Sequence, residues 1–437
     1  MRALPWIACY VALALAPLAV AAFGDPIASP RPWTVEFATA LGLVAFGVIA
    51  VEFALVSRLH VVARPFGNDV LMRFHRQMGF AAVAFAVGHA ICALIVGTPW
   101  SCLWPHSGSL GARSGSVALW CLVALVATSV LRRRVRLPYE IWQRLHRWLA
   151  LATTLAMLVH ALALGSYVRA PAVRIVLIGS VAVFLALLAH YRVVRPLRAW
   201  GRPWELAALR HEGGDTRTLV LRPVGHAGFA FEPGQFVWLS TGATPFNSEE
   251  HPLSIASSAA PAALGRLELA VKALGDWSRE VVPRLQPGAR VWLDGPFGAF
   301  SLDRVAAQEL VMIAGGIGVS PMRSMLLSMR DRGDPRRATL FYASRNRSRA
   351  PFAPHFEALA KEMNLRLVLV HEERDEQSSA EHGYVTAELL KRHLPGSLER
   401  TVFFVCGPLA MMDAVEDALA QLGVDASRIR TERFDMV

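Results

Sequence analysis

Six long apolar stretches in the first half of the chain constrain its fold more than any other feature. They lie at residues 4–23, 33–56, 75–97, 115–131, 143–164 and 172–191. Each is close to the roughly 20 residues that an α-helix needs to cross the hydrocarbon core of a bilayer. Backbone N–H and C=O groups find no partner in lipid, so such stretches must form helices. The sequence therefore predicts an all-α bundle of six membrane-spanning helices.

The first apolar stretch, residues 4–23, also has the position of a signal peptide. It is long, and no convincing small-residue cleavage site stands before Asp25, so we expect a retained span. The five cysteines show no CxxC pair or metal-ligand spacing, which makes a disulfide framework or a zinc site unexpected.

The net charge of +11 is carried mostly by arginines that flank the apolar stretches. This placement favours membrane orientation over nucleic-acid binding. The loops after the second, fourth and sixth stretches hold Arg58, Arg64, Arg73, Arg132, Arg133, Arg134, Arg136, Arg144, Arg192, Arg195 and Arg198. The opposite loops carry only Arg31, Arg113, Arg169 and Arg174. The positive-inside bias predicts an inner (plasma) membrane protein whose termini and second half are cytoplasmic.

Four histidines stand inside the third and fifth predicted spans. His75 and His89 are 14 residues apart, and so are His146 and His160. Fourteen residues are nearly four helical turns, so each pair shares a helix face about 21 Å apart along the axis. Isolated structural histidines would not be expected to repeat one spacing. We predict axial ligation of two stacked haems, His75 with His146 on the cytoplasmic side and His89 with His160 on the outer side.

Two acidic residues, Glu36 and Glu52, stand near the ends of the second span. Charged groups inside a membrane are costly, and they default to functional hypotheses. For these two we expect an interfacial position or a structural pair rather than a proton path.

The membrane half resembles the ferric reductase-like transmembrane family, which includes NADPH oxidases and iron reductases. The resemblance is carried by Phe74-His75-Arg76, by Gly88-His89, and by residues 139–147 with His160. It implies a di-haem domain. Arg76 and Arg147, with Arg73 and Arg144, lie beside the inner haem level. They either pair with its propionates or only mark the membrane boundary.

Beyond Trp204 short alternating strands are predicted at 216–223, 235–240, 265–272 and 290–293, which indicates a small antiparallel barrel. Within it, His251-Pro252-Leu253-Ser254 resembles the flavin-binding signature of the ferredoxin–NADP reductase superfamily. The resemblance implies FAD, with the Ser254 hydroxyl near flavin N5. The segment with Lys272, Gly275, Trp277 and Ser278 combines a turn with a predicted helix start, whose amides can hold a pyrophosphate.

A second glycine-rich segment follows the buried strand 310–314. It contains Gly315, Gly316, Gly318, Ser320 and Pro321. The glycines allow close approach of the backbone to a pyrophosphate, Ser320 is a predicted N-cap, and Pro321 fits the first position of a helix over about 321–331. Strands at 338–343, 365–370 and 401–405 alternate with helices, which predicts a doubly wound parallel sheet.

Three further positions are predicted to contact the nicotinamide nucleotide or the flavin. Arg345 follows the second strand of the predicted sheet, where an arginine suits a 2′-phosphate, so NADPH is expected rather than NADH. Cys406-Gly407-Pro408 matches the superfamily motif beside the nicotinamide. Phe434 is the candidate for the near-terminal aromatic that covers the flavin in that superfamily. Buried-cysteine and terminal-strand roles are the alternatives.

The resemblance covers residues 33–437 and implies a multi-domain chain. The expected domains are a six-helix transmembrane di-haem bundle (1–198), an antiparallel β-barrel FAD domain (199–302) and an α/β NAD(P)H domain with a doubly wound parallel sheet (303–437). The implied activity is electron transfer from NADPH through FAD and two b-type haems to an outer acceptor. That acceptor is a ferric chelate, oxygen (an NADPH oxidase producing superoxide), or a partner redox protein. Nucleic acid is not expected as a partner.

Overall fold

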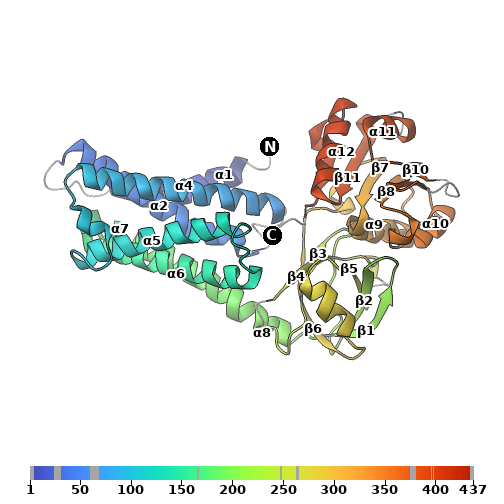
Figure 1. The fold of residues 1–437 in the computed structure, drawn as a ribbon, viewed down its shortest axis with the longest axis horizontal. Helices are drawn as coiled ribbons and strands as arrows, with labels where there is room; N and C mark the ends of the chain where they lie inside the picture. The colour runs from blue at the N-terminus through green and yellow to red at the C-terminus, as the bar shows by residue number, and fades with distance from the viewer. Residues whose placement is uncertain are drawn as a thin grey trace. The chain divides into compact units, whose positions relative to one another are not determined.

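The computed structural model describes residues 4–23, 31–59, 68–164, 167–246, 249–261, 265–374, 380–394, 396 and 398–433. The chain divides between Val194 and Arg195 into two compact units. We call residues 4–194 the helical unit and residues 195–433 the C-terminal unit; Figure 1 draws both.

The helical unit consists of long helices, as predicted. They are α1 (Leu4–Phe23), α2 (Trp33–Val56), α4 (Asn68–Ile95), α5 (Leu110–Leu131), α6 (Tyr139–Leu164) and α7 (Pro171–Ala189). Within the described residues, six helices are long and apolar enough to cross a membrane, and the last of them continues through a π-helical turn (His190–Val194) into α8 (Arg195–Trp200). The chain is therefore a multi-pass membrane protein.

Two differences from the predicted spans matter for the histidines. Helix α4 begins at Asn68 and α6 begins at Tyr139, each several residues before the predicted span. His75 and His146 consequently lie two turns inside their helices rather than at the ends. In Figure 1, α4, α5 and α6 run side by side along the helical unit, and α2 packs along α4.

Helix α1 is a packed part of the helical unit. It lies against α2 so closely that a Cβ placed on Gly47 would come within 1.8 Å of the Ala14 carbonyl oxygen. Tyr10 and Ala14 are buried together with Val48 and Leu55 of α2. The glycine in α2 thus permits backbone-to-backbone approach of the two helices, which is how membrane helices commonly associate.

The first domain of the C-terminal unit is an antiparallel barrel, which confirms the predicted architecture. Its strands are β1 (Trp204–His211), β2 (Thr216–Pro223), β3 (Phe236–Ser240), β4 (His251–Ser254), β5 (Leu267–Lys272) and β6 (Arg290–Phe297). They are ordered β4-β3-β6-β1-β2-β5. A bridge between Ile255 and Leu269 links the two ends of this order. Strand β1, of eight residues, and strand β4, of four, were not among the predicted strands.

The second domain is a parallel sheet, also as predicted. Its strands are β7 (Glu309–Gly315), β8 (Arg337–Ser344), β9 (Leu365–His371), β10 (Glu381–His382), β11 (Thr401–Cys406) and β12 (Ile429–Thr431), in the order β10-β9-β8-β7-β11-β12. Its helices are α9 (Val319–Arg332), α10 (Ala353–Glu362), α11 (Ala387–His393) and α12 (Leu409–Gln421). Strands β10 and β12 extend the edges of the sheet beyond what the sequence indicated.

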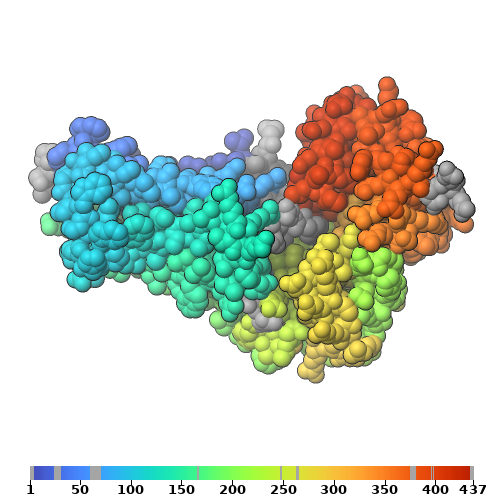
Figure 2. All heavy atoms as spheres, in the orientation of Figure 1, coloured from blue at the N-terminus to red at the C-terminus, as the bar shows by residue number. Residues whose placement is uncertain are grey.

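The barrel and the parallel-sheet domain share one hydrophobic core. Ala256 and Ala270 of the barrel are buried with Met322 and Met325 of α9. Figure 2 shows the two domains of this unit in direct contact, the orange and red parallel-sheet domain against the yellow and green barrel. The C-terminal unit therefore packs as one body around α9.

Candidate functional site

The four span histidines come together in two pairs. The ring centres of His75 and His146 are 6.3 Å apart, and those of His89 and His160 are 5.9 Å apart. In both pairs the rings meet edge to face, from α4 on one side and α6 on the other. The helical periodicity that the equal spacing indicated thus places the histidines at two levels of the helical unit.

Backbone carbonyls hold the rings of the second pair, which we call the outer pair (His89 and His160). Nδ1 of His89 lies 2.7 Å from the Ala38 oxygen, and Nδ1 of His160 lies 2.7 Å from the Gly111 oxygen. Each bond requires Nδ1–H as the donor, so Nε2 of each ring carries the free lone pair. Histidines that ligate a metal are held in this way.

Two glycines, neither of them among the predicted site residues, make room for the outer pair. A Cβ on Gly115 would lie 2.4 Å from Nδ1 of His160, and a Cβ on Gly42 would lie 3.0 Å from Nδ1 of His89. Any larger residue would push against the imidazoles. The sequence signal that could have identified them is a glycine inside an apolar span, because such a glycine commonly allows another group to approach the helix closely.

Side chains hold the first pair, which we call the inner pair (His75 and His146). Nδ1 of His75 contacts a carboxylate oxygen of Glu52, and Nδ1 of His146 lies 3.3 Å from the Ser129 hydroxyl. Trp142 donates to the same hydroxyl over 3.2 Å. Glu52 is buried at 8% exposure, so of the two expectations for it the structural contact fits and an exposed, snorkelling side chain does not.

Glu52 has a second partner from the first helix. The Tyr10 hydroxyl donates a hydrogen bond of 2.7 Å to Oε1 of Glu52. Glu36, in contrast, accepts from Tyr167, so the two acidic residues of α2 form separate contacts rather than a pair with each other. The predicted arginines lie near the inner pair on the same helices: Arg76 is exposed, and Arg147 donates through Nε to the Gln143 oxygen at 3.1 Å.

The predicted flavin strand is β4, paired with β3. Its Ser254 is buried, and His251 stacks on Trp277 with ring centres 3.8 Å apart. Burial lowers the pKa of His251 to about 4, although Glu250 opposes the shift. The Trp277 indole donates to the Thr241 hydroxyl over 3.0 Å, which fixes the ring that His251 covers. His251 is therefore a neutral, stacked side chain at neutral pH.

The turn that precedes Trp277 differs from the prediction. A helical segment does begin at Trp277, but it is a five-residue π-helix (Trp277–Val281) followed by one 3₁₀ turn. The amides of Leu274 and Gly275 both donate to the Ser278 hydroxyl at 2.9 Å. Because Ser278 occupies these amides, a pyrophosphate here would have to be held by other groups.

Lys272 at the end of β5 is such a group. Its Nζ lies 3.6 Å from the place a Cβ on Gly316 would occupy, so the end of the barrel strand meets the glycine-rich turn of the parallel-sheet domain. Gly316 has φ of +53°, a conformation that favours glycine. The structure thus brings together one predicted flavin residue and one predicted nucleotide residue.

The other two glycines of this turn have a packing role. A Cβ on Gly318 would lie 2.4 Å from the Cys406 oxygen, and a Cβ on Gly315 would lie 2.8 Å from Cδ of Pro408. The glycine-rich turn and the Cys406–Pro408 segment therefore lie against each other at the carboxyl ends of β7 and β11, which pair in the sheet. This edge is where open α/β sheets bind ligands.

Two details of the predicted helix start are wrong. The N-cap of α9 is Gly318, and Ser320 lies inside the first turn, where its hydroxyl donates to the Ile317 oxygen at 2.8 Å. Pro321 is consequently the third residue of the helix rather than the first. The 3₁₀ turn Gly316–Gly318 leads directly into α9, and for that reason the helix begins earlier than the serine indicated.

Cys406 is buried at 1% exposure. Burial, and next the Glu432 carboxylate, raise the pKa of its thiol well above the usual range, so the thiol is neutral. Phe434 lies outside the described residues. The chain just before it is placed: Glu432 donates its amide to the Val405 oxygen at 3.3 Å, and its Oε1 would be 3.0 Å from a Cβ on Gly298 of the barrel.

Arg345 follows β8 and is exposed. Its two arginine neighbours are engaged, because Arg347 pairs with Glu357 at 2.8 Å and Arg349 lies 3.8 Å from Asp215. Within the described part of the chain, Arg345 has no ion-pair partner. Its guanidinium is thus the one of the three that is available to an anionic ligand.

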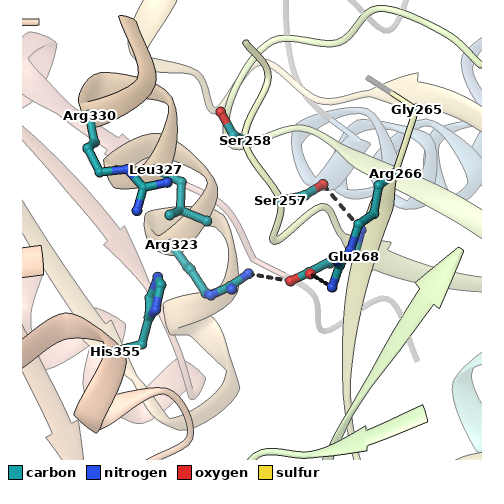
Figure 3. A pocket seen from close by; sticks show the side chains of 9 residues that line it. All are labelled: Ser257, Ser258, Gly265, Arg266, Glu268, Arg323, Leu327, Arg330 and His355. Carbon is teal, nitrogen blue, oxygen red and sulfur yellow. Dashed lines mark hydrogen bonds and ion pairs between the residues drawn. The ribbon is translucent and has the colours of Figure 1, made fainter. Parts of the chain in front are cut away.

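A buried ion pair joins the two domains of the C-terminal unit (Figure 3). Arg323 of α9 donates to Glu268 of β5 at 2.8 Å and to the Ala256 oxygen at 2.7 Å. Burial alone would raise the pKa of Glu268, but Arg323, Arg210 and Arg266 lower it on balance. The pair lines a cavity of about 390 Å³ with Ser257, Ser258, Gly265, Arg266, Leu327, Arg330 and His355.

Helix α9 is also fixed to the segment that follows the flavin strand. The Ser324 hydroxyl donates to the Ser257 oxygen at 2.7 Å, and the Ala259 amide donates to the Ser328 hydroxyl at 2.8 Å. One face of the helix that begins at the glycine-rich turn therefore binds the chain just beyond Ser254. This coupling holds the two predicted cofactor regions in one arrangement, and none of its contacts was predicted from the sequence.

Two protein families match separate parts of the chain. Residues 41–157 match the ferric reductase like transmembrane component, and residues 312–417 match the oxidoreductase NAD-binding domain. The chain is 33% identical over 209 residues to the reductase component of phenol 2-monooxygenase from Pseudomonas sp. (strain CF600), covering 47% of this chain and 58% of that protein. It is 29% identical over 245 residues to a flavohemoprotein of Bordetella pertussis, covering 53% and 60%.

The chain therefore spans less than two thirds of the length of these curated relatives. Among solved structures, the flavohem-like FAD/NAD binding domain of nitric oxide dioxygenase from Vibrio cholerae O1 biovar El Tor matches 53% of this chain and 98% of that chain. That match has a TM-score of 0.48 and 22% sequence identity.

Proposed function

We infer that the chain has the ferric reductase and NADPH oxidase arrangement, because a match to the ferric reductase like transmembrane component precedes a match to the oxidoreductase NAD-binding domain. The chain is thus a membrane oxidoreductase with an FAD- and NAD-binding reductase module. From this premise we propose that it transfers electrons from cytoplasmic NADPH to a small acceptor on the outer side, using FAD and two b-type haems.

The single observation that carries this proposal is the geometry of the two histidine pairs. Two imidazoles that ligate one metal ion through bonds of about 2 Å have ring centres roughly 6 Å apart. The inner and outer pairs have ring centres at 6.3 and 5.9 Å. Three of the four Nδ1 atoms have hydrogen-bond partners, and that of His75 contacts the Glu52 carboxylate. Each pair therefore fits a bis-histidine haem held through Nε2, and bound haem would supply one-electron redox chemistry.

The FAD site is supported by residues that converge at one end of the barrel. Ser254 is positioned by β4, Lys272 lies at the end of β5 beside Gly316, and His251 and Trp277 form a flat stacked pair. Lys272 would offset pyrophosphate charge. Bound flavin would accept a hydride and release single electrons, which nicotinamide alone does not do. Cys406 and Phe434 remain predicted contacts of the nicotinamide and the flavin.

NADPH is the proposed donor because Arg345 has its guanidinium available at the end of β8. In this type of sheet the ribose of the nucleotide meets that strand end. We expect Arg345→Ala to reduce kcat/KM for NADPH by about tenfold or more, the value of one charge-assisted contact, while NADH changes little. Arg347→Ala is the matched control, since Arg347 is held by Glu357. Equal loss with both nucleotides would contradict the assignment.

The proposed orientation rests on charge. Arginines concentrate in the segments after α2, α5 and α7 and before or at the start of α4 and α6, and the inner pair lies near the starts of α4 and α6. By the positive-inside bias this supports a cytoplasmic inner pair and an acceptor near the outer pair. The proposed location is a bacterial inner (plasma) membrane with the C-terminal unit cytoplasmic.

The proposed acceptor is a ferric chelate or oxygen. The test is to purify the full chain, record its absorption spectrum, and measure NADPH oxidation with ferric citrate or oxygen, each with and without superoxide dismutase. We expect a b-type haem spectrum and turnover with at least one acceptor. Iron-dependent turnover that dismutase leaves unchanged indicates a reductase, and superoxide formation indicates an oxidase. A preparation without a haem spectrum would refute the proposal, and haem without turnover would point to a partner redox protein instead.

A further inference from the structure

The two histidine pairs are held by groups of different charge. Both outer rings face neutral backbone carbonyls at 2.7 Å. Of the inner rings, His146 faces the Ser129 hydroxyl, and His75 contacts the Glu52 carboxylate. Glu52 is thus the one acidic side chain of the described helical unit that contacts a predicted ligand.

Glu52 has a second contact besides the His75 ring, and the two contacts involve different carboxylate oxygens. Its side chain is 10% exposed, and Tyr10 of α1 donates to Oε1 while His75 contacts Oε2. Tyr10 packs edge to face on Phe74, the residue before His75, with ring centres 4.8 Å apart. A buried carboxylate in a membrane span is costly. Two fixed polar partners, one on each oxygen, are what makes this one tolerable.

A carboxylate at Nδ1 changes the ligand that Nε2 presents. An imidazole whose Nδ1–H points at a carboxylate is a stronger electron donor than one that points at a carbonyl, because the negative charge increases the basicity of the ring. Stronger donation stabilises the oxidised metal and so lowers the reduction potential of the site. Second-shell hydrogen bonding is one of the established ways in which a protein tunes haem.

We propose that Glu52, oriented by Tyr10, is a positioning residue that sets the reduction potential of the inner site below that of the outer site. This inference rests on the proposed function. A lower inner potential makes electron transfer from the cytoplasmic side to the outer side favourable. It also gives α1 a role, since Tyr10 lies outside residues 41–157 that match the transmembrane family.

The test is a potentiometric titration of the haem absorption in the purified full chain and in two variants. Glu52→Gln keeps the shape and removes the charge, so the lower of the two midpoint potentials should rise while the higher one stays. Tyr10→Phe removes the donor that orients the carboxylate, so the lower midpoint should also rise, by less than in Glu52→Gln. A merely structural role would shift both midpoints together or neither of them.

Glu36→Gln is the matched control, since Glu36 lies on the same helix and contacts Tyr167 instead of a histidine. It should leave both midpoints unchanged. The ferric electron paramagnetic resonance signal of one site should change in Glu52→Gln and not in the control. Unchanged midpoints in Glu52→Gln, or equal shifts of both midpoints, would overturn the proposal. The proposed function fails separately, if the unmodified chain shows no pair of haem midpoints.

Discussion

The imidazole rings of the outer and inner histidine pairs are held in place by different kinds of group. The outer rings are held by the backbone and admitted by two glycines, Gly42 and Gly115. The inner rings are held by side chains, and no glycine of the described residues has a virtual Cβ against them. The outer site is therefore specified by how closely the helices approach, and the inner site by which side chains stand beside it.

Removing a ligand tests whether the pairs are separate sites. We expect His160→Ala to abolish the outer site alone and His146→Ala to abolish the inner site alone, each leaving one haem per chain. Loss of a supporting contact typically costs 10- to 100-fold in metal affinity. Loss of a ligand should therefore lower electron transfer by at least about 100-fold. Haem content per chain and NADPH oxidation are the measurements. A variant that loses both haems, or neither, would break the distinction.

Gly115→Ala tests the role of helix approach. The new Cβ would lie 2.4 Å from Nδ1 of His160, so the ring or the helix must move. Overpacking of this kind costs about 1–3 kcal/mol. We expect at least about tenfold weaker retention of the outer haem, with the inner haem unaffected. Gly79→Ala is the control, because a Cβ there meets nothing within 4 Å. Unchanged haem binding in Gly115→Ala would contradict the claim.

A half-buried histidine of the barrel extends the comparison beyond the helical unit. His251 is stacked on Trp277, and its pKa is about 4, against about 6.5 for an unfolded chain. Between these values the unfolded chain binds more protons, so the free energy of unfolding of the C-terminal unit should fall as pH decreases from about 6.5 to about 4. Denaturant unfolding at pH 7 and pH 5 measures this. His251→Gln should reduce the pH dependence, and His382→Gln, at an exposed position, should not.

The sequence predicted the fold well where one residue pattern decides it. Apolar length predicted the six spans, and the common spacing of 14 residues predicted which histidines share a helix face. The order of strands, glycine-rich turns and helices predicted the barrel and the parallel sheet. These features are local, so neighbouring residues are enough to specify them.

The contacts that fix the side chains could not be predicted, because their partners are distant in sequence. Tyr10 and Glu52 are 42 residues apart, and His89 and Ala38 are 51 residues apart. Which of Glu36 and Glu52 meets a histidine depends on how α1, α2 and α4 pack. Ser320 misled the prediction of the helix start for a similar reason, since the turn Gly316–Gly318 is set by its packing on Cys406 and Pro408.

The attachment of α9 to the barrel limits how such chains can recombine. Three residues of α9 bind groups of the barrel between residues 256 and 268: Arg323, Ser324 and Ser328. Each of these contacts has one partner in the parallel-sheet domain and one in the barrel. A chimera that exchanged only the parallel-sheet domain for that of a relative would separate these partners and leave charged groups buried without them. Exchange should succeed only where the barrel segment and α9 are exchanged together. The unit that can be transferred between relatives is therefore the barrel segment with α9, rather than either domain alone.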